Sequence, residues 1–306
     1  MNKKKYVNRN YLTTTRIIAL GFLITVIVGT ILLSLPIASA NGTWTDLLTA
    51  AFTSTTSVCV TGLVVVDTFS YWSLFGKGVI LILIQIGGLG IVSIITLFML
   101  LFRMKITLKS TMLLQDAFNL NSKQGLLKFT IKVIKGTFLI EGIGAFIYSF
   151  YYCREYGLLK GIWFSVFHAV SAFCNAGLDI MGADSLIPYH SNLLMMLNTS
   201  FLIIMGGIGF IVWWDTVEAF RRIRTKKCSI RSAWNGVHLQ TKIAIFMTLL
   251  LLIGGTVVIY FLERSNPDTL GNLSEKDRIL NAFFQSVTLR TAGFAAVPQA
   301  ALRPVT

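Results

Sequence analysis

The sequence is poor in charge. Of its 306 residues only 13% are Asp, Glu, Lys or Arg, about half the share in an average soluble protein, whereas 54% are hydrophobic. So few charged side chains cannot cover the surface of a soluble domain of this size. Several apolar stretches instead exceed the roughly 20 residues that a helix needs to cross a bilayer. We therefore predict an all-α polytopic membrane protein.

Cysteine and histidine are also scarce, and their spacing excludes further classes. The four cysteines show no C-x-x-C spacing, so we expect neither a disulfide framework nor a zinc site. The three histidines stand far apart at positions 168, 190 and 238. A membrane enzyme would need a convergent set of His, Asp, Glu or Ser in its spans, and no such set is evident. We expect no enzymatic activity and no cofactor in this chain.

Acidic residues are few against the basic ones, 13 against 27. A nucleic-acid-binding protein would gather its Lys and Arg residues on one face of a soluble domain. Here they form blocks between apolar stretches, so we expect no nucleic acid as a partner. Cytoplasmic loops of membrane proteins collect Lys and Arg. The basic blocks are the N-terminus up to Arg16, residues 103–135 and residues 221–242.

Five stretches are long enough to cross the membrane, and two of them separate each basic block from the next. One topology therefore places every basic block and the N-terminus in the cytoplasm of a multi-pass plasma-membrane protein. The predicted crossings are residues 16–38, 74–102, 128–152, 191–216 and 240–262.

Three apolar segments are too short to cross, which is typical of re-entrant helices. They lie near residues 44–58, 159–174 and 277–289, and the sequences at their ends, FTSTTSVCVTGL, FHAVSAFCNAGL and FFQSVTLRTAGF, align without gaps. Their glycines, Gly62, Gly177 and Gly293, are 115 and 116 residues apart. The stretch IQIGGLGIVSI from Ile84 also resembles IIMGGIGFIVW from Ile203. This regularity predicts a repeated unit of helix, re-entrant helix, glycine loop and helix.

Each complete unit contains two crossings, so successive units enter the membrane in the same sense. This predicts parallel pseudo-symmetry around a central pore, not the inverted repeat common in secondary transporters. The predicted organisation is a cytoplasmic N-terminus (1–15), a first unit (16–102), a cytoplasmic linker (103–127), a second unit (128–220), a basic cytoplasmic linker (221–239) and a third unit (240–306) without its second helix, with no fourth unit.

A chain that dips into the membrane and returns extended leaves backbone carbonyls unpaired, which is tolerated where they line water or bind an ion. Glycine allows the turn, and a ring of such carbonyls can replace the water shell of K⁺. The predicted ion-binding carbonyls are those of Cys59, Val60, Thr61 and Gly62, of Cys174, Asn175, Ala176 and Gly177, and of Arg290, Thr291, Ala292 and Gly293.

The motifs TGLVVVDT, QIGGLG, SAFCNAGL and TLRTAGF resemble the superfamily of Trk, Ktr and plant high-affinity potassium transporters, most closely the bacterial Ktr membrane (pore) subunit. The resemblance runs from about Arg16 to Phe294. It implies a single-chain pseudo-fourfold pore for K⁺, usually homodimeric, regulated by a cytosolic ring of subunits that bind nucleotide. Members with serine at the first filter position resemble sodium-preferring transporters, so Gly62 favours potassium uptake. The alternative is a sodium-coupled or sodium-selective secondary transporter.

That family has four units, whereas this chain ends 13 residues after Gly293. Extending the repeat period predicts a fourth glycine near position ~408. We therefore expect the chain to be C-terminally incomplete.

Some polar residues allow two interpretations. Arg290 is either a charge in the pore or, as we prefer, a buried brace paired with an acid. His168 is either a pH sensor or, preferably, a hydrogen-bonded core residue. Glu141 is an intramembrane functional acid or contacts the backbone of a neighbouring helix. Asp67 attracts cations or caps a helix.

Two other pairs of features are also open. Cys59 and Cys174 occupy matching positions, where a soft-metal site is conceivable and small apolar packing is preferred. The G-G-x-G motifs at 87–90 and 206–209 act either as hinges or, preferably, as sites of close helix packing.

Overall fold

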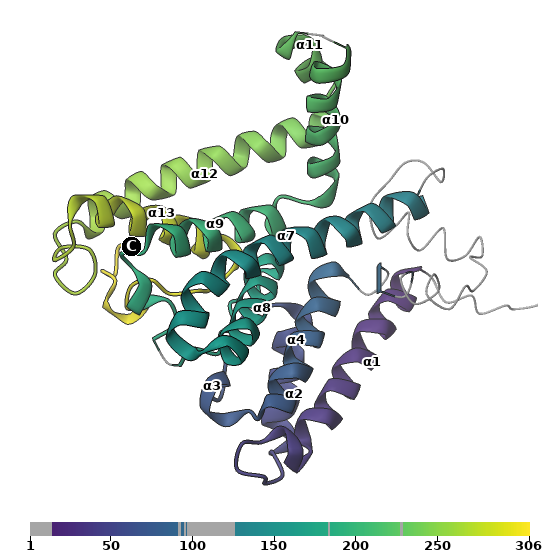
Figure 1. Ribbon diagram of the computed structural model, residues 1–306, viewed down its shortest axis with the longest axis vertical. Helices are drawn as coiled ribbons and strands as arrows, with labels where there is room; N and C mark the ends of the chain where they lie inside the picture. Colours follow the sequence, from purple (N-terminus) through teal and green to yellow (C-terminus); the bar gives the residue numbers. More distant parts are fainter. Residues whose placement is uncertain (1–13, 91–92, 95, 97–125, 183, 227–228) are drawn as a thin grey trace, which may run out of the picture.

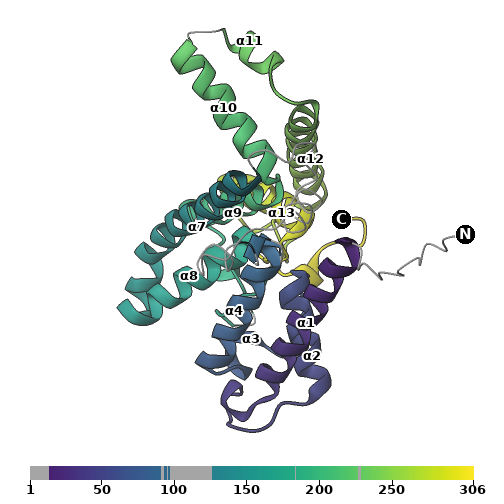
Figure 2. The same ribbon diagram turned by 90° about the vertical axis from the view of Figure 1, so that its right-hand side faces the viewer.

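The computed structural model describes residues 14–90, 93–94, 96, 126–182, 184–226 and 229–306 (Figures 1 and 2). Within these residues the regular structure is helical, apart from one isolated antiparallel bridge between Ser39 and Trp72. The predicted all-α membrane architecture is therefore confirmed. The α-helices described are α1 (Thr14–Ser34), α2 (Leu47–Cys59), α3 (Thr68–Tyr71), α4 (Leu74–Leu89), α7 (Leu126–Tyr156), α8 (Leu158–Cys174), α9 (Leu193–Gly207), α10 (Phe210–Lys226), α11 (Ile230–Asn235), α12 (Leu239–Glu263) and α13 (Glu275–Thr291).

Three of these helices, α1, α7 and α12, are long and apolar enough to cross a membrane. They correspond to the predicted crossings 16–38, 128–152 and 240–262. α1 ends at Ser34, and a short 3-10 helix, Pro36–Ala38, follows. The proline at its start cannot supply a backbone N–H to continue α1. Of the predicted crossing 74–102, α4 forms the first part, and residues 91–92, 95 and 97–102 lie outside the described residues.

The predicted crossing 191–216 is not one straight helix but a bent pair, α9 and α10, which together are long and apolar enough to cross a membrane. α9 ends at Gly207, α10 begins at Phe210, and the two helices meet at 101°. Gly209 between them has φ +96°, a conformation that an α-helix does not contain. The apolar pattern runs through this break because hydropathy does not register one residue with positive φ.

The three short apolar segments form helices α2, α8 and α13, within a few residues of the predicted bounds. α2 begins at its cap Asp46, whose carboxylate accepts from the N–H of Leu48 at 3.1 Å. α13 begins in the same way at Ser274, whose hydroxyl accepts from the N–H of Asp277 at 3.2 Å. Each of these helices packs against two or three others: α2 against α1 and α4, α8 against α7, α9 and α4, and α13 against α12 and α9 (Figure 1).

Burial follows the pattern expected in lipid. α1 exposes Leu23 and Ile24 by 54% and 59%, so its apolar side chains face outward. In contrast, hydroxyl groups of α2 lie inside: Ser54 and Ser57 are fully buried, and the Ser54 hydroxyl donates to the Val26 carbonyl at 2.8 Å. With no hydrophobic driving force between helices in lipid, small and polar residues hold the interior together.

Candidate ion-conducting site

Two of the short helices end in the same unusual conformation. Val60 follows α2 with φ +56°, and Asn175 follows α8 with φ +61°, both in the left-handed region that non-glycine residues seldom adopt. Gly62 and Gly177, two residues further on, also have positive φ, +76° and +64°. These residues turn the chain away from the helix axis. The carbonyls at the helix end therefore have no intrahelical partner.

The third loop differs by one residue. α13 continues to Thr291, so Arg290 and Thr291 lie in its last turn, and Ala292 remains in the right-handed region. The positive φ falls on Gly293, at +85°. The last carbonyls of a helix have no intrahelical partner either, so those of Arg290 and Thr291 are still available to a cation.

The three glycine loops lie directly against one another. A Cβ atom added to Gly62 would lie 2.5 Å from the Ala176 carbonyl oxygen. One added to Gly177 would lie 1.8 Å from the Ala292 carbonyl oxygen and 3.1 Å from the Cα of Gly293. Residues from positions 62, 177 and 293 are therefore brought together, and carbonyl oxygens of the second and third loops reach the glycine of a neighbouring loop. Only glycine fits at positions 62 and 177, by both space and φ.

A hydroxyl near the end of each short helix holds its loop. The Thr56 hydroxyl lies 2.6 Å from that of Thr61 and accepts from the N–H of Leu63 at 3.0 Å. The Ser171 hydroxyl donates to the Leu178 carbonyl at 2.5 Å, and the Thr288 hydroxyl donates to the Phe294 carbonyl at 2.8 Å. The sequence reasoning missed Thr56, Ser171 and Thr288.

The signal for these residues was present in the alignment. Thr56 and Ser171 stand six residues before their glycines, and Thr288 stands five before Gly293. That one-residue shift matches the extra helical residue of α13. Ser and Thr side chains commonly hydrogen-bond to nearby backbone groups, so hydroxyls at matching positions near the ends of these helices indicate a bond to the loop that follows.

The glycines of the G-G-x-G motifs serve two purposes. A Cβ atom would lie 2.1 Å from the Val58 carbonyl oxygen at Gly87, 2.3 Å from the Cys174 sulfur at Gly88 and 1.7 Å from the Phe173 carbonyl oxygen at Gly206. These three positions therefore allow α4 and α9 to approach the ends of α2 and α8, as the packing interpretation predicts. The last glycine of each motif instead has positive φ, at Gly90 after α4 and at Gly209 before α10.

Glu141 lies behind the second loop. It is 4% exposed, and its carboxylate oxygens accept from the Gln85 amide at 3.1 and 3.3 Å. The Cys174 sulfur is 4.0 Å from one of these oxygens. The partner of Glu141 is thus a side chain of α4 and not the backbone of a neighbouring helix.

Arg290 lacks the expected brace. Its side chain is partly exposed, and no acid in the described part of the chain forms an ion pair with it. The salt bridge that we preferred from the sequence is therefore not formed by any described acid.

The structure shows the hydrogen-bonded core position that we preferred for His168 and, of the two alternatives for Asp67, the helix cap. His168 is 1% exposed, with Nδ1 2.9 Å from the Phe164 carbonyl oxygen. Asp67 caps α3, accepting from the N–H of Phe69 at 3.2 Å and from the hydroxyl of Ser70 at 2.6 Å. Partial burial alone would raise the pKa of the Asp67 carboxyl. The hydrogen bonds from Ser70 and Phe69 outweigh this effect and hold that pKa below its usual value.

The matching cysteines have different surroundings. Cys59 is exposed and Cys174 is buried. Among the described residues, no group of three or more His, Cys, Asp or Glu side chains is placed to hold a metal ion. Cys174 therefore fits the interpretation of small apolar packing, against Gly88 of α4.

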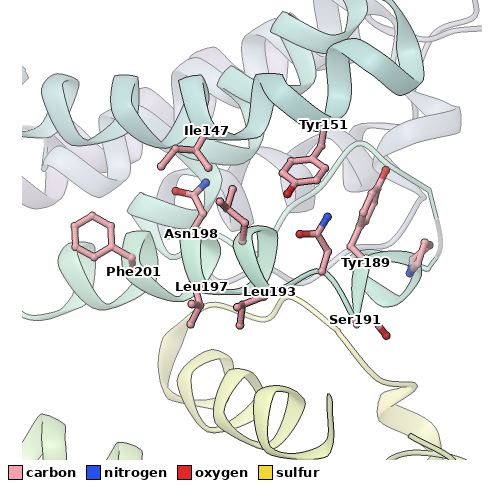
Figure 3. Close-up of a pocket in the computed structure, with 11 residues that line it drawn as sticks. Ile147, Tyr151, Tyr189, Ser191, Leu193, Leu197, Asn198 and Phe201 are labelled. Atoms are coloured by element: carbon pink, nitrogen blue, oxygen red, sulfur yellow. The ribbon is translucent and has the colours of Figure 1, made fainter. Parts of the chain in front are cut away.

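A cavity of about 920 Å³ lies between α7 and α9, apart from the glycine loops (Figure 3). Tyr151 and Ile147 of α7 line one side, and Leu197 and Phe201 of α9 line the other. None of the predicted carbonyl residues borders it. The cavity is mainly apolar, and we assign it no part in ion binding.

Comparison with known proteins shows the family of the chain. The family model TrkH, described as cation transport protein, matches residues 3–306. The chain belongs to this cation transport family. Family membership and the apolar helices identify a multi-pass membrane protein of a transporter family.

The names of several relatives refer to potassium uptake. The chain is 40% identical over 289 residues to the potassium/sodium uptake protein NtpJ of Enterococcus hirae, covering 94% of this chain and 61% of that protein. It is 37% identical over 304 residues to the Ktr system potassium uptake protein B of Bacillus subtilis, covering 99% and 65%. The protein of that name from Vibrio alginolyticus is 35% identical over 282 residues, with coverage of 92% and 59%. The chain thus spans about three fifths to two thirds of the length of these relatives.

Proposed function

We propose that this chain takes up K⁺ across the plasma membrane through a filter of backbone carbonyls at its three glycine loops. The observation that carries the proposal is the contact between these loops, with the Ala176 carbonyl oxygen 2.5 Å from the Cβ position of Gly62 and that of Ala292 1.8 Å from the Cβ position of Gly177. Gathered carbonyl oxygens can replace the hydration shell of K⁺. The names of the NtpJ and Ktr relatives support potassium as the cation.

Helix orientation supports the same site. The C-terminal ends of α2 and α8 lie directly before the clustered loops, and α13 ends shortly before Gly293. The C-terminal end of a helix carries a partial negative charge, so all three favour a cation at the loops without an acidic side chain. The proposed coordinating carbonyls are those of residues 59–62, 174–177 and 290–293.

The surroundings of the pore are further parts of the proposal. By analogy with the Ktr proteins, we expect a homodimer with a cytosolic regulatory ring that binds nucleotide, and an N-terminus in the cytoplasm. The basic residues before α1, in 103–135 and in 221–242 support this orientation. The pseudo-fourfold arrangement of helix, pore loop and helix units around one axis also belongs to the proposal.

Sodium is the second candidate cation, because the name of NtpJ includes both ions. Replacing Gly62 by Ser separates the two. A Cβ atom there would push on the Ala176 carbonyl, and φ +76° disfavours any side chain. A filter with a displaced carbonyl no longer fits K⁺ as well, so we expect selectivity to shift toward Na⁺.

The test is growth at low potassium in cells that lack potassium uptake, with the gene expressed at its natural length. The wild-type gene should restore growth and K⁺ uptake, and Gly62→Ser should lower the ratio of K⁺ to Na⁺ uptake. Gly78→Ser, at a helical glycine of α4 with open space around it, is the control and should leave that ratio unchanged. Absence of rescue, or an equal effect of both substitutions, would refute the assignment.

A further inference from the structure

A second cavity, of about 420 Å³, lies between the first turns of α7 and the helix α10. Its lining includes three bases and one acid: Lys132, Arg221, Arg222 and Glu218. Glu218 is paired with Arg222 at 2.8 Å. The pair is neutral as a unit, so Lys132 and Arg221 leave the cavity with two positive charges.

The wall of this cavity is aromatic. The Lys132 ammonium lies 5.4 Å from the centroid of the Trp214 ring, a cation–π distance. A Cβ atom at Gly136 of α7 would lie only 3.7 Å from the Trp214 ring, so α7 and α10 are in close contact here. On the same stretch of α10, Val217 and Phe220 are 54% and 66% exposed. The basic side chains of this cavity thus lie beside exposed apolar side chains.

The length of α7 places Lys132 at a membrane surface. Its 31 residues rise about 46 Å, against a hydrocarbon core of about 30 Å. α7 ends at Tyr156 and is followed directly by α8, the predicted re-entrant helix, which turns back into the membrane. The end at Tyr156 therefore lies at one membrane surface, and the excess length of α7 lies in its first turns. Lys128, Lys132 and Lys135 occupy these turns, where we expect the lipid headgroups to lie.

α10 has the direction of a helix that lies on the membrane. It meets α9 at 101°, and both views show α10 and α11 projecting from the remaining helices (Figures 1 and 2). Basic side chains beside exposed apolar ones are typical of a helix at the membrane interface. A helix that is nearly perpendicular to α9 can therefore rest along the cytoplasmic leaflet.

We propose that the cavity between α7 and α10 binds the phosphate headgroup of an acidic phospholipid in the cytoplasmic leaflet. Lys132 and Arg221 contact the phosphate, Trp214 forms the wall, and Val217 and Phe220 lie against the acyl chains. Basic pockets beside membrane helices on this side bind such headgroups. The side of the membrane rests on the orientation given under the proposed function, whereas the pocket itself does not.

The test uses the protein at the length that its gene encodes, in nanodiscs of phosphatidylcholine with or without phosphatidylglycerol. Native mass spectrometry counts the lipids retained by each variant. Lys132→Gln with Arg221→Gln should lower retention of phosphatidylglycerol roughly tenfold more than Lys135→Gln with Arg224→Gln. The control pair removes the same charges from the same helices, outside the cavity lining. The charge-preserving pair Lys132→Arg with Arg221→Lys should keep the lipid.

Equal losses in the two glutamine pairs would overturn the proposal, because they would indicate general surface charge. Competition by soluble glycerol 3-phosphate as strong as by phosphatidylglycerol would overturn the lipid as source. No preference for phosphatidylglycerol would also overturn it and favour an acidic protein surface as the partner.

Thermal midpoints in phosphatidylcholine report whether each variant is folded, and Lys132→Gln alone carries the test if the double variant unfolds. Loss of K⁺ uptake with normal lipid retention would count against the proposed transport and leave the lipid site standing.

Discussion

Gln85 and Glu141 join α4 to α7 through one buried amide–carboxylate contact, with the Gln85 nitrogen 3.1 and 3.3 Å from the two carboxylate oxygens. The contact lies behind the second glycine loop, since the Cys174 sulfur is 4.0 Å from the same carboxylate. The Gln85 oxygen is buried and has no hydrogen-bond partner in the described part of the chain. An acid buried at membrane depth is costly to keep, which makes a functional role the first hypothesis.

Glu141→Gln should separate charge from packing. A glutamine amide can accept from the Gln85 nitrogen and donate to the unpartnered Gln85 oxygen, so the thermal midpoint should stay the same or rise. The substitution also removes the ionisable carboxyl behind the loop, and we expect apparent K⁺ affinity in uptake assays to fall severalfold. Glu141→Ala, in contrast, leaves the Gln85 nitrogen unpartnered and should cost about 1–3 kcal/mol of stability.

Glu155→Gln is the control for charge, because Glu155 is exposed near the C-terminal end of the same helix. Unchanged K⁺ affinity in Glu141→Gln would assign the carboxylate to packing alone. A drop of equal size in Glu155→Gln would place the effect in the general field of the protein and not behind the loop.

Ser171→Ala tests the hydroxyl that holds the second loop. The Ser171 hydroxyl donates to the Leu178 carbonyl at 2.5 Å and is fully buried. Its removal leaves that carbonyl without its donor, which should cost about 1 kcal/mol of stability and loosen the loop. Flux assays with K⁺ and Na⁺ should then show a smaller preference between the ions.

Ser149→Ala is the matched control, because its hydroxyl also bonds to a carbonyl, that of Phe146 at 2.7 Å, but at a partly exposed position of α7. It should alter neither stability nor ion preference. If Ser171→Ala kept its full ion preference, the hydroxyl would hold the helix end without influencing the filter.

Much of this architecture could be predicted from the sequence because it depends on properties that recur along it. Long apolar runs gave α1, α7 and α12, and the glycines at 62, 177 and 293 marked loops that the structure brings into contact. Both features follow from local chemistry: hydrophobic length sets the crossings, and positive φ selects glycine.

Other features depend on what is near in space, so the sequence pattern did not contain them. The 101° break between α9 and α10 depends on one backbone angle at Gly209 within an apolar run. The partner of Glu141 is 56 residues away at Gln85, and no spacing rule connects the two. Arg290 was assigned an acidic partner because a charge in a membrane usually has one, but no described acid forms an ion pair with it.

Gly206→Ala tests whether close packing of α9 on the second loop is required. A Cβ atom there would lie 1.7 Å from the Phe173 carbonyl oxygen, which is backbone at the end of a buried helix and cannot rotate away. α9 must therefore shift outward, and the cost of overpacking a buried contact is about 1–3 kcal/mol or more. Thermal unfolding in detergent should show a clearly lower midpoint, and K⁺ uptake should fall because the carbonyls beside Cys174 move with the helix end.

Gly254→Ala is the matched control, because Gly254 lies inside α12 with open space around its Cβ position. Alanine there should raise stability by up to about 1 kcal/mol through helix propensity. Equal midpoints for the two variants would mean that α9 does not press on the loop, and the packing assigned to the second G-G-x-G motif would then be wrong.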